Sequence, residues 1–145
     1  MKISFKKLNE KAVVPTYGSK DSAGADIRAC IDHEIVISPG GIAVVSTGIA
    51  VEIPENFFGM MCPRSGLAVK NGITLLNSPG IIDSDYRGEL RMVLINHSDK
   101  HFTVEDEMRM AQLIVVPFVC VDWVESVELS KTNRGSGGFG STGVK

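Results

Sequence analysis

Short apolar runs separated by glycine and proline dominate this chain and limit what it can fold into. The 145 residues include 15 glycines and six prolines. The runs between them are rich in β-branched and aromatic residues, which favour strands. No stretch longer than about ten residues shows the sustained apolar spacing of a helix. The pattern predicts an all-β protein in which many short strands are joined by tight turns.

The same runs predict where the strands lie. We expect strands over residues 3–8, 35–37, 43–53, 57–61, 73–76, 90–96, 102–105 and 110–117, with 119–127 completing the folded part. One short helix is expected over 65–70, because the following Asn71-Gly72 is a typical C-terminal stop. The segment 22–29, in which small residues surround Asp26, is by itself most typical of a tight barrel corner.

Composition and charge exclude several classes of protein. Hydrophobic residues make up 43% of the chain and charged residues 22%, as in soluble globular proteins. The net charge of −2 gives no argument for binding nucleic acid or a membrane surface. No apolar run approaches the roughly twenty residues that span a bilayer. The three cysteines form no C-x-x-C pair, which argues against a zinc site. Because the N-terminus lacks a signal-peptide pattern, we expect a cytoplasmic protein.

The segment from Asn77 to Glu89 is the strongest candidate for a functional site. It joins two predicted strands, whereas a plain hairpin connection needs only about two to five residues. It carries an amide, carboxylates, a phenol and a guanidinium around one turn, among them Asp83 and Tyr86. Alternatively, Asp83 bonds its own backbone and Tyr86 packs its ring on the sheet. Polar clusters elsewhere in the chain favour the functional interpretation.

A second candidate lies where the short helix is expected to begin, at Arg64, Ser65 and Gly66. Free backbone N–H groups, a hydroxyl and a guanidinium at a helix N-terminus suit a phosphate. The alternative is that Ser65 merely caps the helix. Arg109 and Gln112 stand among apolar residues three positions apart, which predicts opposite faces of a strand, so they need not have the same role.

The last stretch, residues 133–143, is rich in glycine and formally matches G-x-G-x-x-G. A dinucleotide-binding fold is rejected, because too few residues remain for the helix that must follow. Composition alone predicts a flexible tail. The stretch also holds Arg134, Phe139 and two hydroxyls among glycines whose N–H groups could wrap an anion. A tail that closes over a phosphate compound, with Phe139 stacked on a flat base, is the more specific hypothesis.

Five segments in this order resemble the trimeric dUTPase family (deoxyuridine triphosphate nucleotidohydrolases). The matching segments are residues 23–27, 63–68, 80–89, 109–114 and 134–143, and they span nearly the whole chain. The third and fifth are specific on their own, and all five together are much more so. No departure occurs at a position that would carry chemistry.

The resemblance implies a distorted, jelly-roll-like β-barrel over residues 1–130 and a mobile, glycine-rich lid over 131–145. It implies a homotrimer whose active sites are shared between subunits. It also implies hydrolysis of dUTP to dUMP and pyrophosphate with Mg²⁺, an activity that keeps uracil out of DNA and supplies dUMP for thymidylate synthesis.

The resemblance also implies a role for each matched residue. Asp83 is similar to the general base that activates water for attack at the α-phosphorus. Asp26 is similar to an acidic residue near the metal, which it would reach through water while the substrate phosphates hold Mg²⁺. The expected substrate-binding residues are Asn77, Gly80 and Ile82 around the uracil, Tyr86 under the deoxyribose, Arg64, Ser65, Gly66 and Gln112 at the phosphates, and Arg134, Phe139, Gly140, Ser141 and Thr142 in the tail.

Two other readings of the sequence compete with this one. A dCTP deaminase-like enzyme shares the barrel and part of the patterns, but the intact run 83–86 and the full glycine-rich tail resemble the hydrolase. A non-catalytic nucleotide-sensing module could use the same trimer. Such a module is expected to have lost the base or the arginine of the tail, and both Asp83 and Arg134 are present.

Overall fold

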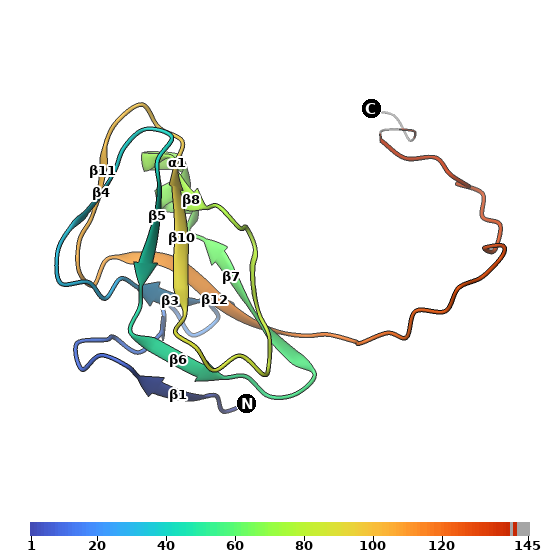
Figure 1. Cartoon of the computed structure of the whole chain (residues 1–145), viewed down its shortest axis with the longest axis horizontal. Coiled ribbons are helices and arrows are strands. Elements are labelled where there is room, and N and C mark those ends of the chain that lie inside the picture. The colour runs from blue at the N-terminus through green and yellow to red at the C-terminus, as the bar shows by residue number, and fades with distance from the viewer. Residues whose placement is uncertain (140, 142–145) are drawn as a thin grey trace.

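Antiparallel strands make up nearly all of the regular secondary structure in the computed structural model, which describes residues 1–139 and 141 (Figure 1). The strands are β1 (Ser4–Lys7), β2 (Thr16–Tyr17), β3 (Ala25–Arg28), β4 (Ile35–Ile37), β5 (Ile42–Ser46), β6 (Ile49–Glu52), β7 (Phe57–Pro63), β8 (Ile73–Leu75), β9 (Gly80–Ile82), β10 (Arg91–Asn96), β11 (Phe102–Val104) and β12 (Arg109–Pro117). One short helix, α1 (Ser65–Asn71), follows β7. The predicted all-β, jelly-roll-like fold is thereby confirmed.

The strands form four small sheets around one apolar core. The largest has the order β2-β3-β12-β7-β9, and the others are β5-β10-β8, β1-β6 and β4-β11. Val45, Met92, Leu94, Val104 and Ala111 are fully buried where these sheets face one another. Alternate residues of β10 are buried, which is the period-two pattern of a strand with one face on the core.

Glycine decides where two predicted elements break or end. The expected strand over 43–53 is divided into β5 and β6 at Gly48, whose φ of 65° is left-handed. A Cβ there would lie 2.8 Å from the Cβ of Ala12, so no side chain fits. Gly72 ends α1 with the same φ, and its N–H bonds back to Ala68. The predicted helix and its stop are therefore confirmed, one residue longer than expected.

Two segments differ from the sequence-based expectation. Residues 25–28 are not a barrel corner but the strand β3, which pairs with β12 in the largest sheet. The small residues allow a close approach here: a Cβ on Gly24 would lie 3.0 Å from the Cβ of Gln112. The second difference is β9, which pairs with β7 inside the segment that was expected to be loop.

The chain leaves the folded body after β12, so the expectation that residues 119–127 complete the folded part is wrong. Over residues 118–139 the chain forms neither strand nor helix, and Figure 1 shows it running away from the sheets as an arm. Its large apolar side chains face solvent, with Trp123 93% and Val127 103% exposed. Nothing in the described part of a single chain covers these two side chains.

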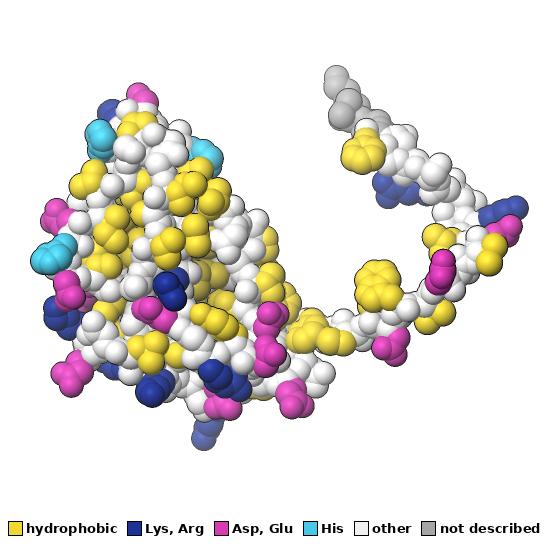
Figure 2. Space-filling view, viewed as in Figure 1, with side chains coloured by type: hydrophobic (Ala, Val, Ile, Leu, Met, Phe, Trp, Pro, Cys, Tyr) yellow, Lys and Arg dark blue, Asp and Glu magenta, His cyan; other side chains and the backbone are white. Residues whose placement is uncertain are grey.

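Apolar side chains also gather on the outer face of the β5-β10-β8 sheet (Figure 2). Val44 and Ile42 of β5 are more than half exposed and pair with Val93 and Ile95 of β10. Among the described residues, no helix is long and apolar enough to cross a membrane.

Candidate functional site

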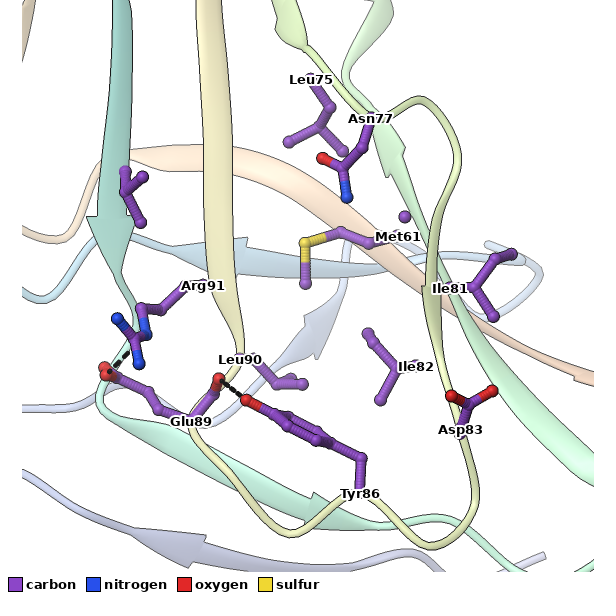
Figure 3. A pocket seen from close by; sticks show the side chains of 12 residues that line it. Met61, Leu75, Asn77, Ile81, Ile82, Asp83, Tyr86, Glu89, Leu90 and Arg91 are labelled. Atoms are coloured by element: carbon purple, nitrogen blue, oxygen red, sulfur yellow. Dashed lines mark hydrogen bonds and ion pairs between the residues drawn. The ribbon is translucent and has the colours of Figure 1, made fainter.

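The central hairpin closes around a pocket of about 350 Å³ (Figure 3). The hairpin is formed as predicted, since β8 and β10 pair antiparallel with Leu75 opposite Leu94. β9 crosses the connection and pairs with β7, which places Gly80 opposite Met61. The lining residues are Val44, Met61, Leu75, Asn77, Gly80, Ile81, Ile82, Asp83, Tyr86, Glu89, Leu90 and Arg91. Its volume is within the range of small-molecule sites.

Asn77 supplies the amide at one end of this pocket. Figure 3 shows its side chain pointing toward Met61 in the pocket. The buried Gly80 keeps this space open: a Cβ there would lie 3.2 Å from the Nδ2 of Asn77 and 3.5 Å from the Cβ of Met61. A flat polar group entering the pocket would therefore meet an amide and the backbone of β9.

Tyr86 lies at the other end of the pocket with its ring across the hairpin (Figure 3). Its Oη donates a hydrogen bond to the backbone carbonyl of Glu89 at 2.9 Å. Gly88 makes this possible, because a Cβ at that position would overlap the Tyr86 hydroxyl. The ring is thus held in place rather than packed on the sheet.

Asp83 stands at the pocket edge, next to Ile82, and is exposed. Its backbone carbonyl accepts the N–H of Tyr86 at 3.2 Å, so the two residues share one turn. Arg87 braces that turn by donating to the carbonyl of Ser84 and, at 3.0 Å, to that of Tyr86. Among the described residues, the side-chain carboxylate has no hydrogen-bond partner, which leaves it able to contact a ligand.

A second polar cluster forms where β3, β12 and the end of β7 meet. Asp26 is only 5% exposed, and its Oδ1 lies 3.1 Å from the Nε of Arg64 while its Oδ2 lies 3.1 Å from Nη1 of Arg109. Gln112 donates to Oδ1 at 3.4 Å. Arg64 also donates from Nη1 to the backbone carbonyl of Arg109 at 3.0 Å. One buried carboxylate thus orients three donors.

The shared role of Arg109 and Gln112 corrects the prediction that they lie on opposite faces. Between Arg109 and Ala111 the pairing with β3 shifts by one residue, as in a β-bulge. A bulge resets the alternation of side chains. Both residues therefore reach Asp26, although they are three positions apart.

The start of α1 is not capped by Ser65. Arg64 is the N-cap residue and makes no side-chain cap bond. Ser65 is the first helical residue, so its hydroxyl does not serve as the N-cap. A Cβ on Gly66 would meet nothing within 4 Å, which leaves open space beside the helix start.

The tail residues form a third group, on the arm and away from both clusters (Figure 1). Arg134 donates from Nε to the carbonyl of Gly137 at 2.8 Å, and Phe139 is fully exposed. Ser141 bonds back to Gly138 through its N–H. The predicted contacts of Gly140 and Thr142 lie outside the described residues.

The structure therefore groups the predicted residues into three patches that share no residue. The pocket holds Asn77, Gly80, Ile82, Asp83 and Tyr86, and the second cluster holds Asp26, Arg64 and Gln112 with Ser65 and Gly66 beside it. Sequence reasoning missed Arg109 as a partner of Asp26 and Glu89 as a support of Tyr86. Both residues lie inside the segments that resemble the family, and that was the only feature of the sequence that could have pointed to them.

The charged side chains of the described residues do not form a metal cage. No group of three or more His, Cys, Asp or Glu side chains comes together there. Asp26, predicted to reach a metal through water, is occupied by two arginines and a glutamine. The two guanidinium groups and the amide N–H are hydrogen-bond donors, which suit an anion such as a phosphate rather than a bare cation.

Comparison with known proteins agrees on one family. A sequence model of the dUTPase family matches residues 10–143. The deoxyuridine 5'-triphosphate nucleotidohydrolase of Hydrogenobaculum sp. (strain Y04AAS1) is 51% identical over 145 residues, which is all of both chains. That of Nautilia profundicola is 49% identical over 143 residues, 99% of each chain.

Solved structures give the same result. A mutant dUTPase of Staphylococcus bacteriophage 80alpha, solved with dUpNHpp, superposes with a TM-score of 0.90 at 28% identity and covers 99% of each chain. A second structure of the 80alpha dUTPase with dUPNHPP gives a TM-score of 0.90 at 29% identity, again over 99% of each chain. Because the family model and relatives at about half identity match nearly the whole chain, this chain belongs to the dUTPase family.

Proposed function

We propose that this protein hydrolyses dUTP to dUMP and pyrophosphate. The observation that carries the proposal is the pocket of about 350 Å³, with an amide at one end, a held tyrosine ring at the other and a carboxylate at its edge. Relatives at about half identity are named for this activity. In the cell, the reaction would keep uracil out of DNA and supply dUMP for thymidylate synthesis.

Asp83 acts as the general base. Its exposed carboxylate takes a proton from water, the water oxygen bonds to the α-phosphorus, and the bond to the bridging oxygen breaks to release pyrophosphate. An isolated carboxylate is a weak base, so the gain comes from placing the water against the phosphorus. The turn that joins Asp83 to Tyr86 supports such placement.

The pocket reads the nucleoside. The amide of Asn77 and the backbone around Gly80 and Ile82 pair with uracil, so cytosine would leave buried polar groups unpaired. Tyr86 lies under the deoxyribose and leaves no room for a 2′-hydroxyl. Its hydrogen bond to Glu89 supports this role, because a ring that could move aside would not exclude the hydroxyl.

The second cluster binds the phosphates. Arg64 and Gln112 contact phosphate oxygens with the help of Ser65 and Gly66, and Asp26 orients the arginine and the glutamine. Mg²⁺ held mainly by the phosphates and water would neutralise charge on the triphosphate, with Asp26 reaching it at most through water. The arginines act from fixed positions, which suits stabilisation of a charged transition state.

A homotrimer brings the three patches together. In one chain the pocket, the arginine cluster and the tail are separate, and the arm exposes Trp123 and other apolar side chains. Exposed apolar surface of this extent marks an interface. The active sites are shared between the subunits, each of which contributes its own barrel. The tail over 131–145 closes as a lid, with Arg134 at the phosphates, Phe139 on the base and Gly140, Ser141 and Thr142 beside them. We place the enzyme in the cytoplasm.

Pyrophosphate release tests the proposal, with dUTP, UTP, dCTP and dTTP compared with and without Mg²⁺. Rapid release from dUTP alone, dependent on Mg²⁺, is the expected result. Ammonia release from dCTP would instead indicate a deaminase-like enzyme. Binding of dUTP without turnover would indicate a nucleotide-sensing module.

A further inference from the structure

Glu89 ties the hairpin that carries Tyr86 to the turn between β5 and β6. Its Oε1 accepts the backbone N–H of Gly48 at 2.8 Å and that of Thr47 at 3.2 Å. We propose that Glu89 is a positioning residue: by holding this end of the hairpin it fixes the Tyr86 ring and sets the discrimination between deoxyribose and ribose. The inference rests on the proposed place of Tyr86 under the sugar.

The carboxylate of Glu89 is well suited to hold a turn. Hydrogen bonds from N–H groups to an ionised acceptor are stronger than those to a neutral acceptor. Here one carboxylate oxygen accepts the N–H groups of two consecutive residues. The Glu89 side chain is only 22% exposed, so water competes little for these bonds. The turn is itself fixed, because Gly48 is left-handed and closely packed on Ala12.

Leu90, the residue after Glu89, makes further hydrogen bonds to the same turn and to β6. Thr47, which is 2% exposed, donates from its Oγ1 to the carbonyl of Leu90 at 2.7 Å. Leu90 in turn donates its N–H to the carbonyl of Ile49 at 2.8 Å. The backbone of Leu90, directly after Glu89, is therefore bonded to the β5–β6 turn and to the start of β6.

The same backbone holds the tyrosine. The carbonyl that accepts the Tyr86 hydroxyl belongs to Glu89, so the ring is tied to the residue whose side chain is tied to the turn (Figure 3). Moving the Glu89 backbone moves the point to which the ring is attached. The Arg91 contact adds little, because its Nε lies 3.8 Å from Oε2 and Arg91 is more than half exposed.

The test compares Glu89→Ala, Glu89→Gln, Tyr86→Phe and Tyr86→Ala by the ratio of kcat/KM for dUTP to that for UTP. Glutamine keeps an oxygen that can accept both N–H groups, so Glu89→Gln should stay within about twofold of the wild type. Glu89→Ala should lower the ratio about tenfold or more, since a ring displaced by about 1 Å can cost that much. Glu52→Ala is the matched control, because it removes an exposed carboxylate that contacts Arg87 in the same hairpin.

The outcomes separate this inference from the proposed role of Tyr86. If Tyr86→Ala lowers the ratio and Glu89→Ala does not, the role of Glu89 is wrong while that of the tyrosine stands. If Tyr86→Ala keeps the ratio, the proposed place of the tyrosine is wrong. Tyr86→Phe, which removes only the hydroxyl, should lower the ratio in the same direction as Glu89→Ala, and the double variant should lose less than the product of the two. Independent, fully multiplicative losses would overturn the inference even if Glu89→Ala folds poorly.

Discussion

The Nε of Arg64 lies 3.1 Å from Oδ1 of Asp26, a carboxylate buried on the strand β3. The same carboxylate receives Arg109 through its other oxygen. Two guanidinium groups on different segments are therefore fixed by one negative charge that hardly contacts solvent. A cluster prearranged in this way needs little reorganisation when it meets a phosphate.

Replacing that charge should damage both binding and folding. In Asp26→Asn we expect the KM for dUTP to rise at least about tenfold and the free energy of unfolding to fall by about 2 kcal/mol, because two arginines lose a charged partner. Steady-state kinetics and urea unfolding measure both effects. Asp32→Asn is the control, since Asp32 pairs with Lys11 at the surface, and it should change neither quantity. Equal effects in the two variants would contradict the anchoring role.

Removing the base should separate binding from turnover. In Asp83→Asn we expect kcat to fall by about 10²-fold to 10⁴-fold while affinity for a non-hydrolysable dUTP analogue stays within a few fold. Stopped-flow proton release and calorimetric titration provide the two readouts. Asp85→Asn, two positions along the same turn, should keep most of its activity. Loss of analogue binding together with turnover would count against Asp83 as the base.

The single tryptophan reports on the arm. If the arm packs on another copy, the emission maximum of Trp123 should lie at a shorter wavelength in the native protein than in the urea-unfolded protein, because the indole is then shielded from water. Light scattering should give three times the 15.6 kDa of one chain. Trp123→Ser should weaken the assembly without changing its secondary structure. A monomer with solvent-like tryptophan emission would refute the trimer.

Removing residues 131–145 should abolish efficient turnover but leave assembly and unfolding temperature unchanged, because that segment contributes no buried side chain within its described part. Phe139→Ala should raise the KM about tenfold through lost stacking on the base, and Phe139→Trp should restore it. Kinetics with dUTP gives the comparison. Full activity in the truncated chain would exclude a lid function.

The Cys30 thiol predicts a loss of stability at high pH. Burial raises the pKa of Cys30 above its ordinary value of 9.0, with smaller contributions from nearby Asp106 and Glu89. On raising the pH, the unfolded chain releases this proton first, so stability is complete below about pH 9 and declines above it. Urea unfolding at about pH 8 and about pH 10 should show a smaller decline in Cys30→Ala than in the wild type. Cys120→Ala, at an exposed position, should decline like the wild type.

The sequence alone determined the fold class, the positions of most strands and the short helix, because alternation, β-branched runs and glycine stops are local signals. It also located the central hairpin, where Asn77, Asp83 and Tyr86 do line one pocket. Local signals sufficed there because all three residues belong to one connection of limited length.

Only the tertiary structure decided which distant residues meet. Asp26 and Arg109 are far apart in the chain, and they meet because β3 and β12 are neighbouring strands. A β-bulge that no local sequence pattern predicts lets both Arg109 and Gln112 reach the same carboxylate. The tie from Glu89 to Gly48 likewise depends on the packing of two turns. The arm after Pro117 has strand-like composition but pairs with no strand among the described residues of its own chain, and a strand is stabilised by the neighbour with which it pairs.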